Sequence, residues 1–454
     1  MDVIESRSPQ DPSDIVVAAP RMTAADVADI VQRARIAQRQ WWSAGAAARA
    51  AGLHAAAEAL AARAEEASML VAREVGKPIT EARGEVQRGI SILRYYAQVS
   101  YLPKGDMFPP SNGVMLWSER RPHGVVGLVT PWNFPVAIPL WKAVPALCAG
   151  NAVVMKPSQE AIACALLLQE VIAPHLPEGL FSVVVGSGSE VGNAVTGSAD
   201  CISFTGSTAV GRGIVRVAAD RNVPVQAEMG GLNAAIVLPD ADYERTAAII
   251  AGGAMWFAGQ KCTATSRVIV VGDGDFETPF INAVEALHIG DPMDPTVTVG
   301  PLINEASLRD FTTAVDGARA SGGRFLTGDA PAEGLFVRPV VMAGLAPDHP
   351  LSCNEVFGPI VTMHRAATPE DAIAMANSVQ YGLVTGIHGR DVNLLTSLAS
   401  QAHSGIVKIN ASTSGVDFYA PFGGEKMSSY GPREQGLAAL DFYSHTTTVT
   451  LAQH

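Results

Sequence analysis

A cysteine with polar neighbours is the residue of this chain best suited to covalent chemistry. Cys262 lies in the segment 259–267, which reads GQKCTATSR. Lone cysteines are often small buried hydrophobic residues, so an inert thiol is one interpretation. Upstream, Glu228 follows an apolar run and begins the segment EMGG. An attacking thiolate and a carboxylate that activates water are the groups a covalent acyl mechanism needs. The residues alone leave both interpretations open.

Three junctions between apolar runs and loops could contact a phosphate-bearing ligand. They read TPWNFP at 130–135, MKPSQ at 155–159 and TGSTAVG at 205–211. Ligands of open parallel sheets bind at the carboxyl ends of strands, beside helix N-termini. The glycines at 206 and 211 would let a phosphate approach backbone N–H groups. The segment is neither a P-loop nor a GxGxxG fingerprint, so taken singly it is also compatible with an ordinary turn.

The elements that would position these residues are first helical and then alternate between strand and helix. Residues 23–37 combine a capping box (Thr23, Asp26) with helical spacing, and 44–75 and 81–96 are predicted helices. Apolar runs follow at 125–129, 152–155, 182–185, 202–205 and 234–238, separated by helical segments such as 161–172 and 189–196. This alternation predicts a parallel sheet covered on both faces, and a second α/β region follows from 268 to about 409.

Two further segments lie outside these helical and α/β regions. Residues 103–121 are predicted to be irregular. Residues 442–451 alternate with β-branched side chains and predict a strand that must find an edge, with another subunit as one candidate partner.

Composition limits the class of protein. The chain has 454 residues, 48% of them hydrophobic and 17% charged, which predicts a soluble globular protein of two or three domains. Its net charge of -12, without a dense Lys/Arg run, argues against nucleic acid or a membrane as partner. We find no secretory signal or membrane span. Five scattered cysteines without CxxC spacing predict a cytoplasmic chain with no disulfide framework and no metal site.

The chain resembles the aldehyde dehydrogenase superfamily from about residue 20 to its C-terminus. Seven motifs occur in the family's order: TPWNFP (130–135), KPS (156–158), FTGSTxxG (204–211), EMGG (228–231), GQKC (259–262), EVFGP (355–359) and PFGGxK (421–426). The resemblance implies an α/β fold with a Rossmann-type parallel-sheet cofactor-binding domain (1–99 and 123–233), an α/β catalytic domain (234–428) and small oligomerisation strand segments (100–122 and 429–454). The N-terminus is shorter than is usual for the family, so we expect a trimmed opening strand pair.

The resemblance implies roles for five catalytic residues. Cys262 would form a thiohemiacetal with an aldehyde, and the amide of Asn133, with the Cys262 backbone N–H, would stabilise the oxyanion. Oxidation would leave a thioester, which water activated by Glu228 would hydrolyse. Lys142 and Glu434 resemble the family's proton-relay pair for that base.

The resemblance also implies a nicotinamide cofactor. The positions that would line its groove are Thr130, Trp132, Lys156, Ser158, Gln159, Gly206, Ser207, Gly211, Glu355 and Phe357. Members that prefer NAD commonly carry glutamate where this chain has Gln159. A neutral amide there would not repel a 2′-phosphate, which Lys156 and Ser158 could hold. We therefore expect the chain to tolerate NADP, with a preference for NADP and use of NAD both open.

The segments around Cys262 and 422–436 are most similar to those of 2-oxoglutarate semialdehyde (2,5-dioxopentanoate) dehydrogenases. Lys261 could recognise an acidic aldehyde or lower the thiol pKa, or simply face solvent or a carbonyl. Trp141 is expected in the pocket wall, and Phe418 and Tyr419 at the aldehyde entrance. These aromatic rings suit an apolar aldehyde equally, and no arginine is obviously placed for a carboxylate.

Three alternatives compete with this interpretation. A CoA-acylating enzyme would use CoA in place of water, and Glu228 argues against it. A dehydrogenase of an aromatic or phosphono-aldehyde would share the mechanism. A catalytically silent scaffold would keep the fold alone, and Cys262, Glu228 and Asn133 argue against that. The family resemblance further implies a homodimer or homotetramer.

Overall fold

A short strand pair and four helices open the chain. The computed structural model describes residues 2–102, 105–110, 114–328 and 333–452. Strands β1 (Val3–Arg7) and β2 (Ile15–Pro20) pair antiparallel, so the opening strand pair is present. Helices α1 (Ala24–Ser43), α2 (Gly45–Ala62), α3 (Ala64–Val75) and α4 (Ile79–Val99) follow. The capping box of Thr23 and Asp26 is confirmed. The predicted helix 44–75 is two helices, because Arg63 leaves the helical conformation (φ -110°, ψ 19°).

A six-stranded sheet carries the three predicted ligand junctions. Its order is β19-β9-β8-β5-β6-β7, and all neighbours except the edge strand β19 are parallel. The strand order reverses between β5 and β8, the kind of position where open α/β sheets bind ligands. The strands are β5 (Val125–Thr130), β6 (Ala152–Pro157), β7 (Phe181–Val183), β8 (Cys201–Thr205), β9 (Val225–Glu228) and β19 (Ser429–Tyr430). The helical segments between them are α5 (Ala137–Ala149), η1 (Gln159–Ala161), α6 (Ile162–Ile172), η2 (Ala173–His175), η3 (Gly188–Gly192), α7 (Asn193–Ser198) and α8 (Thr208–Arg221).

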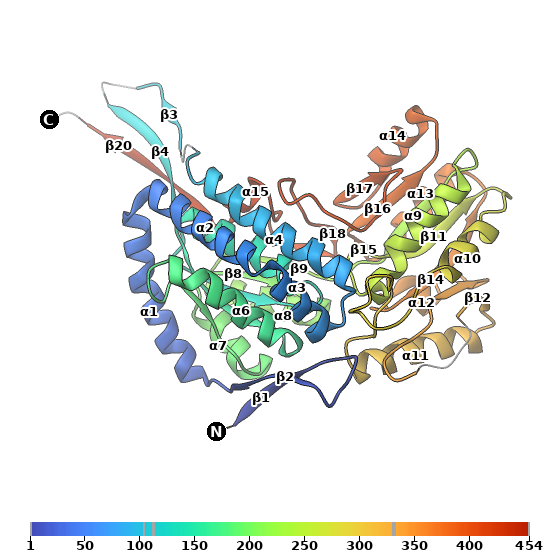
Figure 1. Ribbon diagram of the computed structural model, residues 1–454. Coiled ribbons are helices and arrows are strands. Elements are labelled where there is room, and N and C mark those ends of the chain that lie inside the picture. Colours follow the sequence, from blue (N-terminus) through green and yellow to red (C-terminus); the bar gives the residue numbers. More distant parts are fainter. Residues whose placement is uncertain (1, 103–104, 111–113, 329–332, 453–454) are drawn as a thin grey trace.

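A seven-stranded sheet forms the second half of the molecule (Figure 1). Its order is β12-β13-β14-β11-β10-β16-β17, parallel except for β12. The strands are β10 (Asn233–Val237), β11 (Thr265–Val271), β12 (Arg324–Thr327), β13 (Val340–Ala343), β14 (Ile360–Ala366), β16 (Val384–His388) and β17 (Ile406–Ile409). The helices are α9 (Tyr243–Met255), η4 (Trp256–Gly259), α10 (Glu277–Glu285), α11 (Glu305–Ala320), α12 (Pro350–Cys353), α13 (Pro369–Asn377) and α14 (Val392–Gln401).

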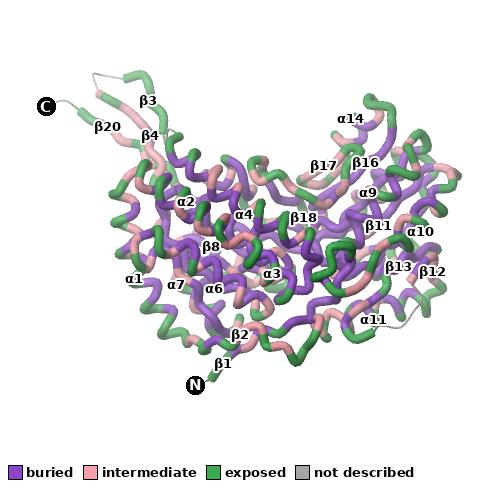
Figure 2. Tube along the Cα trace, viewed as in Figure 1, coloured by how far each residue is buried: buried purple, intermediate pink, exposed green. Residues whose placement is uncertain are grey.

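Both faces of this second sheet are buried, as its continuous apolar runs predict. Successive residues of β11 alternate between two cores. Val268 and Val270 pack with residues of α9 and α10, whereas Ile269 and Val271 pack with residues of α13 and α14. Figure 2 shows the resulting buried interiors of both halves, with exposed residues on the outer helices and loops.

A three-stranded antiparallel sheet extends from the body beside the C-terminus (Figure 1). It contains β3 (Met107–Phe108), β4 (Met115–Pro122) and β20 (Ser444–Leu451), in the order β20-β4-β3. The prediction of an irregular segment at 103–121 is therefore wrong for its described part. The tail strand is confirmed, and its partner is β4 of the same chain, with Ser444 opposite Pro122 and Leu451 opposite Met115.

Short strand pairs in the last third of the chain connect the two large sheets. β15 (Tyr381–Gly382) pairs with β18 (Glu425–Lys426), and β19 continues into the six-stranded sheet beside β9. α15 (Ala438–Phe442) then leads to β20. Residues 422–434 are thereby brought to the carboxyl end of β9. None of the helices in the described residues is both long and apolar enough to cross a membrane.

Candidate active site

Cys262 follows a turn whose backbone conformation favours glycine. Phe257, Ala258 and Gly259 have φ values of 58°, 52° and 65°, three left-handed residues in succession. A Cβ at position 259 would stand 2.4 Å from the carbonyl oxygen of Gly358. Left-handed conformations in non-glycine residues are costly and persist where the surroundings enforce them. The polar stretch around Cys262 is thus a tightly enforced turn between α9 and β11.

Gln260 anchors this turn to both halves of the molecule. The Asn133 side chain, in the loop after β5, donates from Nδ2 to the Gln260 carbonyl oxygen at 3.1 Å. The buried Gln260 side chain donates to the Pro301 carbonyl at 3.1 Å and accepts from the Ile303 N–H at 2.9 Å. Asn133 uses one of its two amide hydrogens here, so the other is available to a ligand.

The Cys262 thiol lies in an environment that disfavours its charge. Burial raises its pKa to about 12, and the carboxylates of Glu355, Glu228 and Glu434 add to the effect. Lys261 is not among the groups that shift the thiol pKa, and its ammonium lies 2.6 Å from Glu81 Oε2. A base or a cationic ligand must therefore assist formation of the thiolate.

Glu228 ends β9 as a buried carboxyl group. Its Oε2 accepts from the Ser429 hydroxyl at 2.6 Å, while its Oε1 has no hydrogen-bond partner within the described ranges. Burial raises its pKa well above the ordinary value, and the charge of Glu434 raises it further. A raised pKa makes this carboxylate a stronger base than an exposed glutamate, which favours proton transfer from water.

Lys142 and Glu434 form a buried ion pair beside Glu228. Lys142, on α5, also donates to the Ser203 hydroxyl at 2.9 Å and to the Phe204 carbonyl at 3.2 Å. The backbone of Glu434 pairs with Phe422 through both its N–H and its carbonyl. The two residues predicted as a relay pair thus lie together.

The loop after α12 meets the loop after β9. Glu355 accepts from the Gly231 N–H at 3.1 Å. A Cβ at position 230 would lie 2.0 Å from its Oε2, so the carboxyl group needs glycine there. Burial raises the Glu355 pKa to about 7. Phe357 stands edge-on to Trp132, with ring centroids 5.7 Å apart.

The start of α8 is open to solvent. Ser207 is the exposed N-cap residue and makes no side-chain capping bond, which leaves N–H groups for an anion. Gly206 donates its N–H to the Glu228 carbonyl at 3.1 Å. Gly211 lies inside α8, where a Cβ would stand 2.8 Å from Met229, so its small size serves helix packing.

At the ends of β5 and β6, a carboxylate absent from our predictions appears. Glu160 accepts from the Ser158 hydroxyl at 2.5 Å and from Asn304 Nδ2 at 3.3 Å. Burial lowers the Lys156 pKa, and the charge of Glu160 partly offsets this. Gln159 is exposed.

Thr130 has a buried hydroxyl with no hydrogen-bond partner in the part of the chain the structure describes. A polar ligand could satisfy it.

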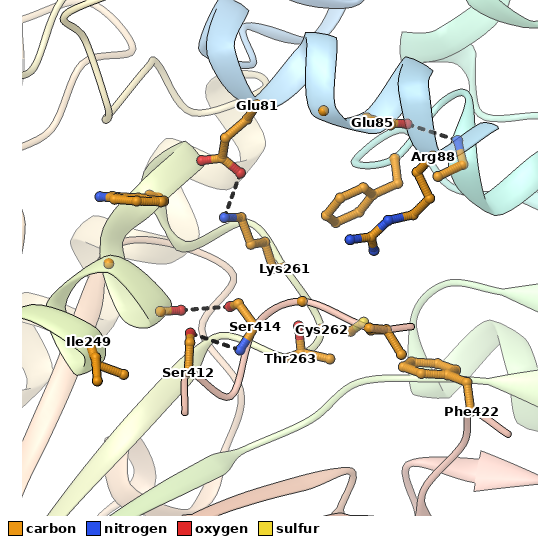
Figure 3. A pocket seen from close by; sticks show the side chains of 18 of the residues that line it. Glu81, Glu85, Arg88, Ile249, Lys261, Cys262, Thr263, Ser412, Ser414 and Phe422 are labelled. Carbon is orange, nitrogen blue, oxygen red and sulfur yellow. Dashed lines mark hydrogen bonds and ion pairs between the residues drawn. The ribbon is translucent and has the colours of Figure 1, made fainter. Parts of the chain in front are cut away.

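A cavity of about 620 Å³ opens onto Cys262 (Figure 3). Trp141 and Lys261 line it, together with Phe134 and Phe422. The other two predicted pocket residues lie elsewhere. Phe418 packs against Tyr95 at a ring-centroid distance of 5.7 Å, and Tyr419 is 59% exposed. The same segment instead lines the cavity with Ser412, Ser414, Gly415 and Val416.

Sequence reasoning missed Glu81 and Arg88, two of the three charged residues of α4 that line this cavity, and it also missed the third, Glu85. Glu81 Oε2 lies 2.6 Å from Lys261 Nζ. With Glu85, these residues have i, i+4, i+7 spacing, which places them on one helix face. Charged residues at that spacing, on a helix whose other residues are mostly packed, are the sequence pattern that could have identified these cavity-lining side chains. No group of three or more His, Cys, Asp or Glu side chains suited to a metal ion occurs among the described residues.

Residues 2–449 match the model of the aldehyde dehydrogenase family, and the chain belongs to this family. It is an NAD(P)-dependent aldehyde dehydrogenase. It is 37% identical over 460 residues to the alpha-ketoglutaric semialdehyde dehydrogenase of Bacillus subtilis, covering 99% of this chain and 94% of that protein. It is 36% identical over 464 residues to the alpha-ketoglutarate semialdehyde dehydrogenase of Haloferax volcanii, covering 99% and 95%.

Solved structures share the fold over nearly the whole chain. A putative methylmalonate-semialdehyde dehydrogenase from Sinorhizobium meliloti in complex with NAD has a TM-score of 0.95 at 27% identity, covering 99% of this chain and 94% of that one. Glyceraldehyde-3-phosphate dehydrogenase GapN from Methanocaldococcus jannaschii in complex with NADP has a TM-score of 0.93 at 28% identity, covering 99% of both chains. The predicted aldehyde dehydrogenase fold is confirmed.

Proposed function

We propose that this dehydrogenase oxidises 2-oxoglutarate semialdehyde to the dicarboxylic acid, with Cys262 as the nucleophile. The observation that carries the proposal is the placement of Cys262 on the cavity, on a turn bonded to Asn133. The match to two semialdehyde dehydrogenases over nearly their full lengths supports the substrate.

The first step is attack of the Cys262 thiolate on the aldehyde carbon. The free amide hydrogen of Asn133 and the Cys262 backbone N–H then stabilise the oxyanion of the thiohemiacetal. Removing one such donor typically lowers the rate by about 10²–10³. Burial raises the thiol pKa, and the carboxylates of Glu355, Glu228 and Glu434 raise it further, so the proton must leave through a neighbouring base.

The second half of the reaction releases the acid. Glu228 accepts a proton from water, which attacks the thioester carbon and expels the Cys262 thiolate. The Ser429 hydroxyl orients this carboxyl group by its hydrogen bond. The Lys142–Glu434 pair lies beside it and modulates its charge, because Glu434 raises its pKa and Lys142 lowers it.

The residues of the groove fit a nicotinamide dinucleotide. An unsatisfied hydroxyl (Thr130), a half-buried carboxyl group (Glu355) and an open helix N-terminus (Ser207) are available to hold one. When bound, this cofactor supplies the two-electron oxidation of the aldehyde carbon.

We propose that both NAD and NADP are used, and that Lys156 and Glu160 oppose each other in the choice. Gln159 leaves room for a 2′-phosphate near the Lys156 ammonium. The Glu160 carboxylate holds the Ser158 hydroxyl, a predicted phosphate contact, and brings negative charge to the same place.

Alternative functions predict different measurements. An aromatic or phosphono-aldehyde dehydrogenase would leave 2-oxoglutarate semialdehyde as a poor substrate in an aldehyde panel. A CoA-acylating enzyme would need CoA for turnover. A silent scaffold would produce no reduced cofactor with any aldehyde.

We further propose a cytoplasmic homodimer or homotetramer with the domain boundaries given above. The five cysteines, all free, suit a reducing compartment.

A further inference from the structure

Arg88 brings an unbalanced positive charge to the wall of the cavity. It projects from α4, is half-buried, and lines the same cavity as Cys262. Figure 3 shows its guanidinium directed into the cavity. Throughout the described part of the chain, no carboxylate forms an ion pair with it and no acceptor takes a hydrogen bond from it. A partly desolvated guanidinium without a partner favours binding of an anion.

The other cations near Arg88 already have partners. Lys261 Nζ lies 2.6 Å from Glu81 Oε2. Lys77 forms a buried ion pair with Glu85. Glu85 also accepts from the Val136 and Ala137 N–H groups at 2.8 and 2.9 Å, so its carboxylate is occupied although it lies on the same helix as Arg88. The unpaired charge of this wall therefore belongs to Arg88.

The remaining wall is mostly apolar. Aromatic rings of Phe134, Trp141 and Phe422 surround the approach to Cys262. Such rings offer an aldehyde carbon chain contact area but no charge, and the hydroxyl groups of the wall, on Thr263, Ser412 and Ser414, are neutral. An acid group on the substrate would therefore find its partner at Arg88.

We infer that Arg88 binds the carboxylate of an acidic aldehyde while Cys262 attacks its carbonyl carbon, which makes Arg88 the residue that selects acidic over neutral aldehydes. This inference rests on the proposed substrate class. A planar guanidinium can donate two parallel hydrogen bonds to a carboxylate, which an ammonium cannot reproduce. The assignment replaces Lys261, whose charge Glu81 neutralises, as the primary carboxylate contact.

The test compares the substrate selectivity of wild type, Arg88→Met and Arg88→Lys. For each, kcat/KM is measured with 2-oxoglutarate semialdehyde and succinic semialdehyde, and with pentanal and butanal as neutral aldehydes of similar length. The Met variant should lower the acidic-to-neutral ratio by roughly 10- to 100-fold, the factor that corresponds to one charge-assisted hydrogen bond. The Lys variant should recover part of this ratio, because it restores the charge but not the planar fork.

Arg83→Met is the matched control on the same helix. Arg83 is exposed, pairs with Glu65 on the surface, and is not a lining residue of the cavity. Its selectivity ratio should equal that of wild type. A second measurement uses glutarate, an unreactive dicarboxylate, as a competitive inhibitor. Its inhibition constant should rise in Arg88→Met by a factor similar to the loss in selectivity, and stay unchanged in the control.

The outcomes separate the inference from the proposed function. If wild type oxidises the acidic aldehydes and Arg88→Met keeps the same ratio and the same glutarate inhibition, the inference is wrong and the function stands. Equal losses with acidic and neutral aldehydes would likewise refute carboxylate recognition. If wild type oxidises pentanal and neither semialdehyde, the proposed substrate class fails, and the inference fails with it.

Discussion

The Cys262 thiol should be largely protonated at neutral pH in the cofactor-free enzyme. Its pKa is raised to about 12, so the thiolate fraction rises with pH over the whole range in which the protein can be handled. Alkylation of Cys262 by iodoacetamide should therefore accelerate about tenfold per pH unit between pH 7 and pH 9. The rate is measured by mass spectrometry, with Cys262→Ser as the blank. A plateau below pH 8 would show that the thiol has a lowered pKa and that its carboxylate surroundings do not act as described.

Glu160 should limit the use of NADP. The substitution Glu160→Gln removes a negative charge beside Lys156 and Ser158 while it preserves the size of the side chain. We expect the ratio of kcat/KM for NADP over NAD to rise roughly 5- to 30-fold, which corresponds to about 1–2 kcal/mol of relieved repulsion. Glu170→Gln, an exposed position on α6, is the control. An unchanged ratio would show that Glu160 has no effect on the choice between NADP and NAD.

Single residues differed in how well the sequence predicted them. Cys262, Glu228 and Asn133 stand in motifs with fixed local spacing, and the structure brings Asn133 to the Cys262 turn. Arg88 and Glu160 carry no motif. Their importance depends on which partners lie across the fold, and a long charged side chain on a helix is usually a solvated one. A sequence pattern cannot show that a neighbouring carboxylate already has an ion-pair partner, as Glu85 has in Lys77.

At the scale of elements, the turn from η4 to Cys262 depends on Gly259. Gly259→Ala places a Cβ 2.4 Å from the Gly358 carbonyl in a left-handed conformation. We expect the free energy of unfolding to fall by about 1–3 kcal/mol, and kcat/KM to fall as well because the turn carries Cys262. Urea denaturation and steady-state kinetics measure the two effects.

Gly213→Ala is the matched control for this substitution. Gly213 lies inside α8, where an added Cβ meets nothing within 4 Å. Alanine there should stabilise the protein by roughly 0.5–1 kcal/mol without loss of activity. If Gly259→Ala behaves like this control, the turn is not under the constraint that we describe.

Elements with strong periodicity were predicted well, and those defined by remote partners were not. The helix at 23–37 and the strands of both large sheets follow from local apolar patterns. The break between α2 and α3 at Arg63 could not be predicted, because neither proline nor glycine occurs at that position. The strand β4 reads as irregular because only its pairing with β3 and with β20, more than 300 residues away, makes it a strand. Edge strands of small sheets depend on such contacts more than on propensity.

At the scale of the whole molecule, the three-stranded sheet suits an interface between copies of this chain. It extends from the body and exposes large apolar side chains, among them Met107 (67% exposed) and Leu451 (53% exposed). Exposed apolar strands of this kind usually pair or pack with a partner. The double substitution Met107→Glu and Leu451→Glu should shift the protein to a smaller species in size-exclusion chromatography with light scattering.

Val392→Glu provides the control for this prediction. Val392 is 68% exposed on α14, in the opposite half of the molecule, so the same new charge there should leave the mass unchanged. A monomeric wild type, or a double variant with the wild-type mass, would contradict the proposed role of this sheet.

The α/β class of the whole molecule could be predicted from the sequence, but the connection between its two α/β regions could not. Alternating strands and helices gave two α/β regions, and the motif order gave the family. The connection between the regions runs through β19, a two-residue strand that pairs Ser429 with Glu228. Two residues carry too little pattern to predict a strand, yet this pairing brings the 422–434 segment to Glu228.

The most direct test of the central claim is an aldehyde panel assayed by absorbance of the reduced cofactor, with NAD and with NADP, for wild type and Cys262→Ala. We predict that wild type reduces cofactor with 2-oxoglutarate semialdehyde more efficiently than with neutral or aromatic aldehydes. Cys262→Ala should remain folded and bind cofactor, but produce no reduced cofactor. Aldehyde-dependent reduction that survives in Cys262→Ala would contradict the covalent mechanism.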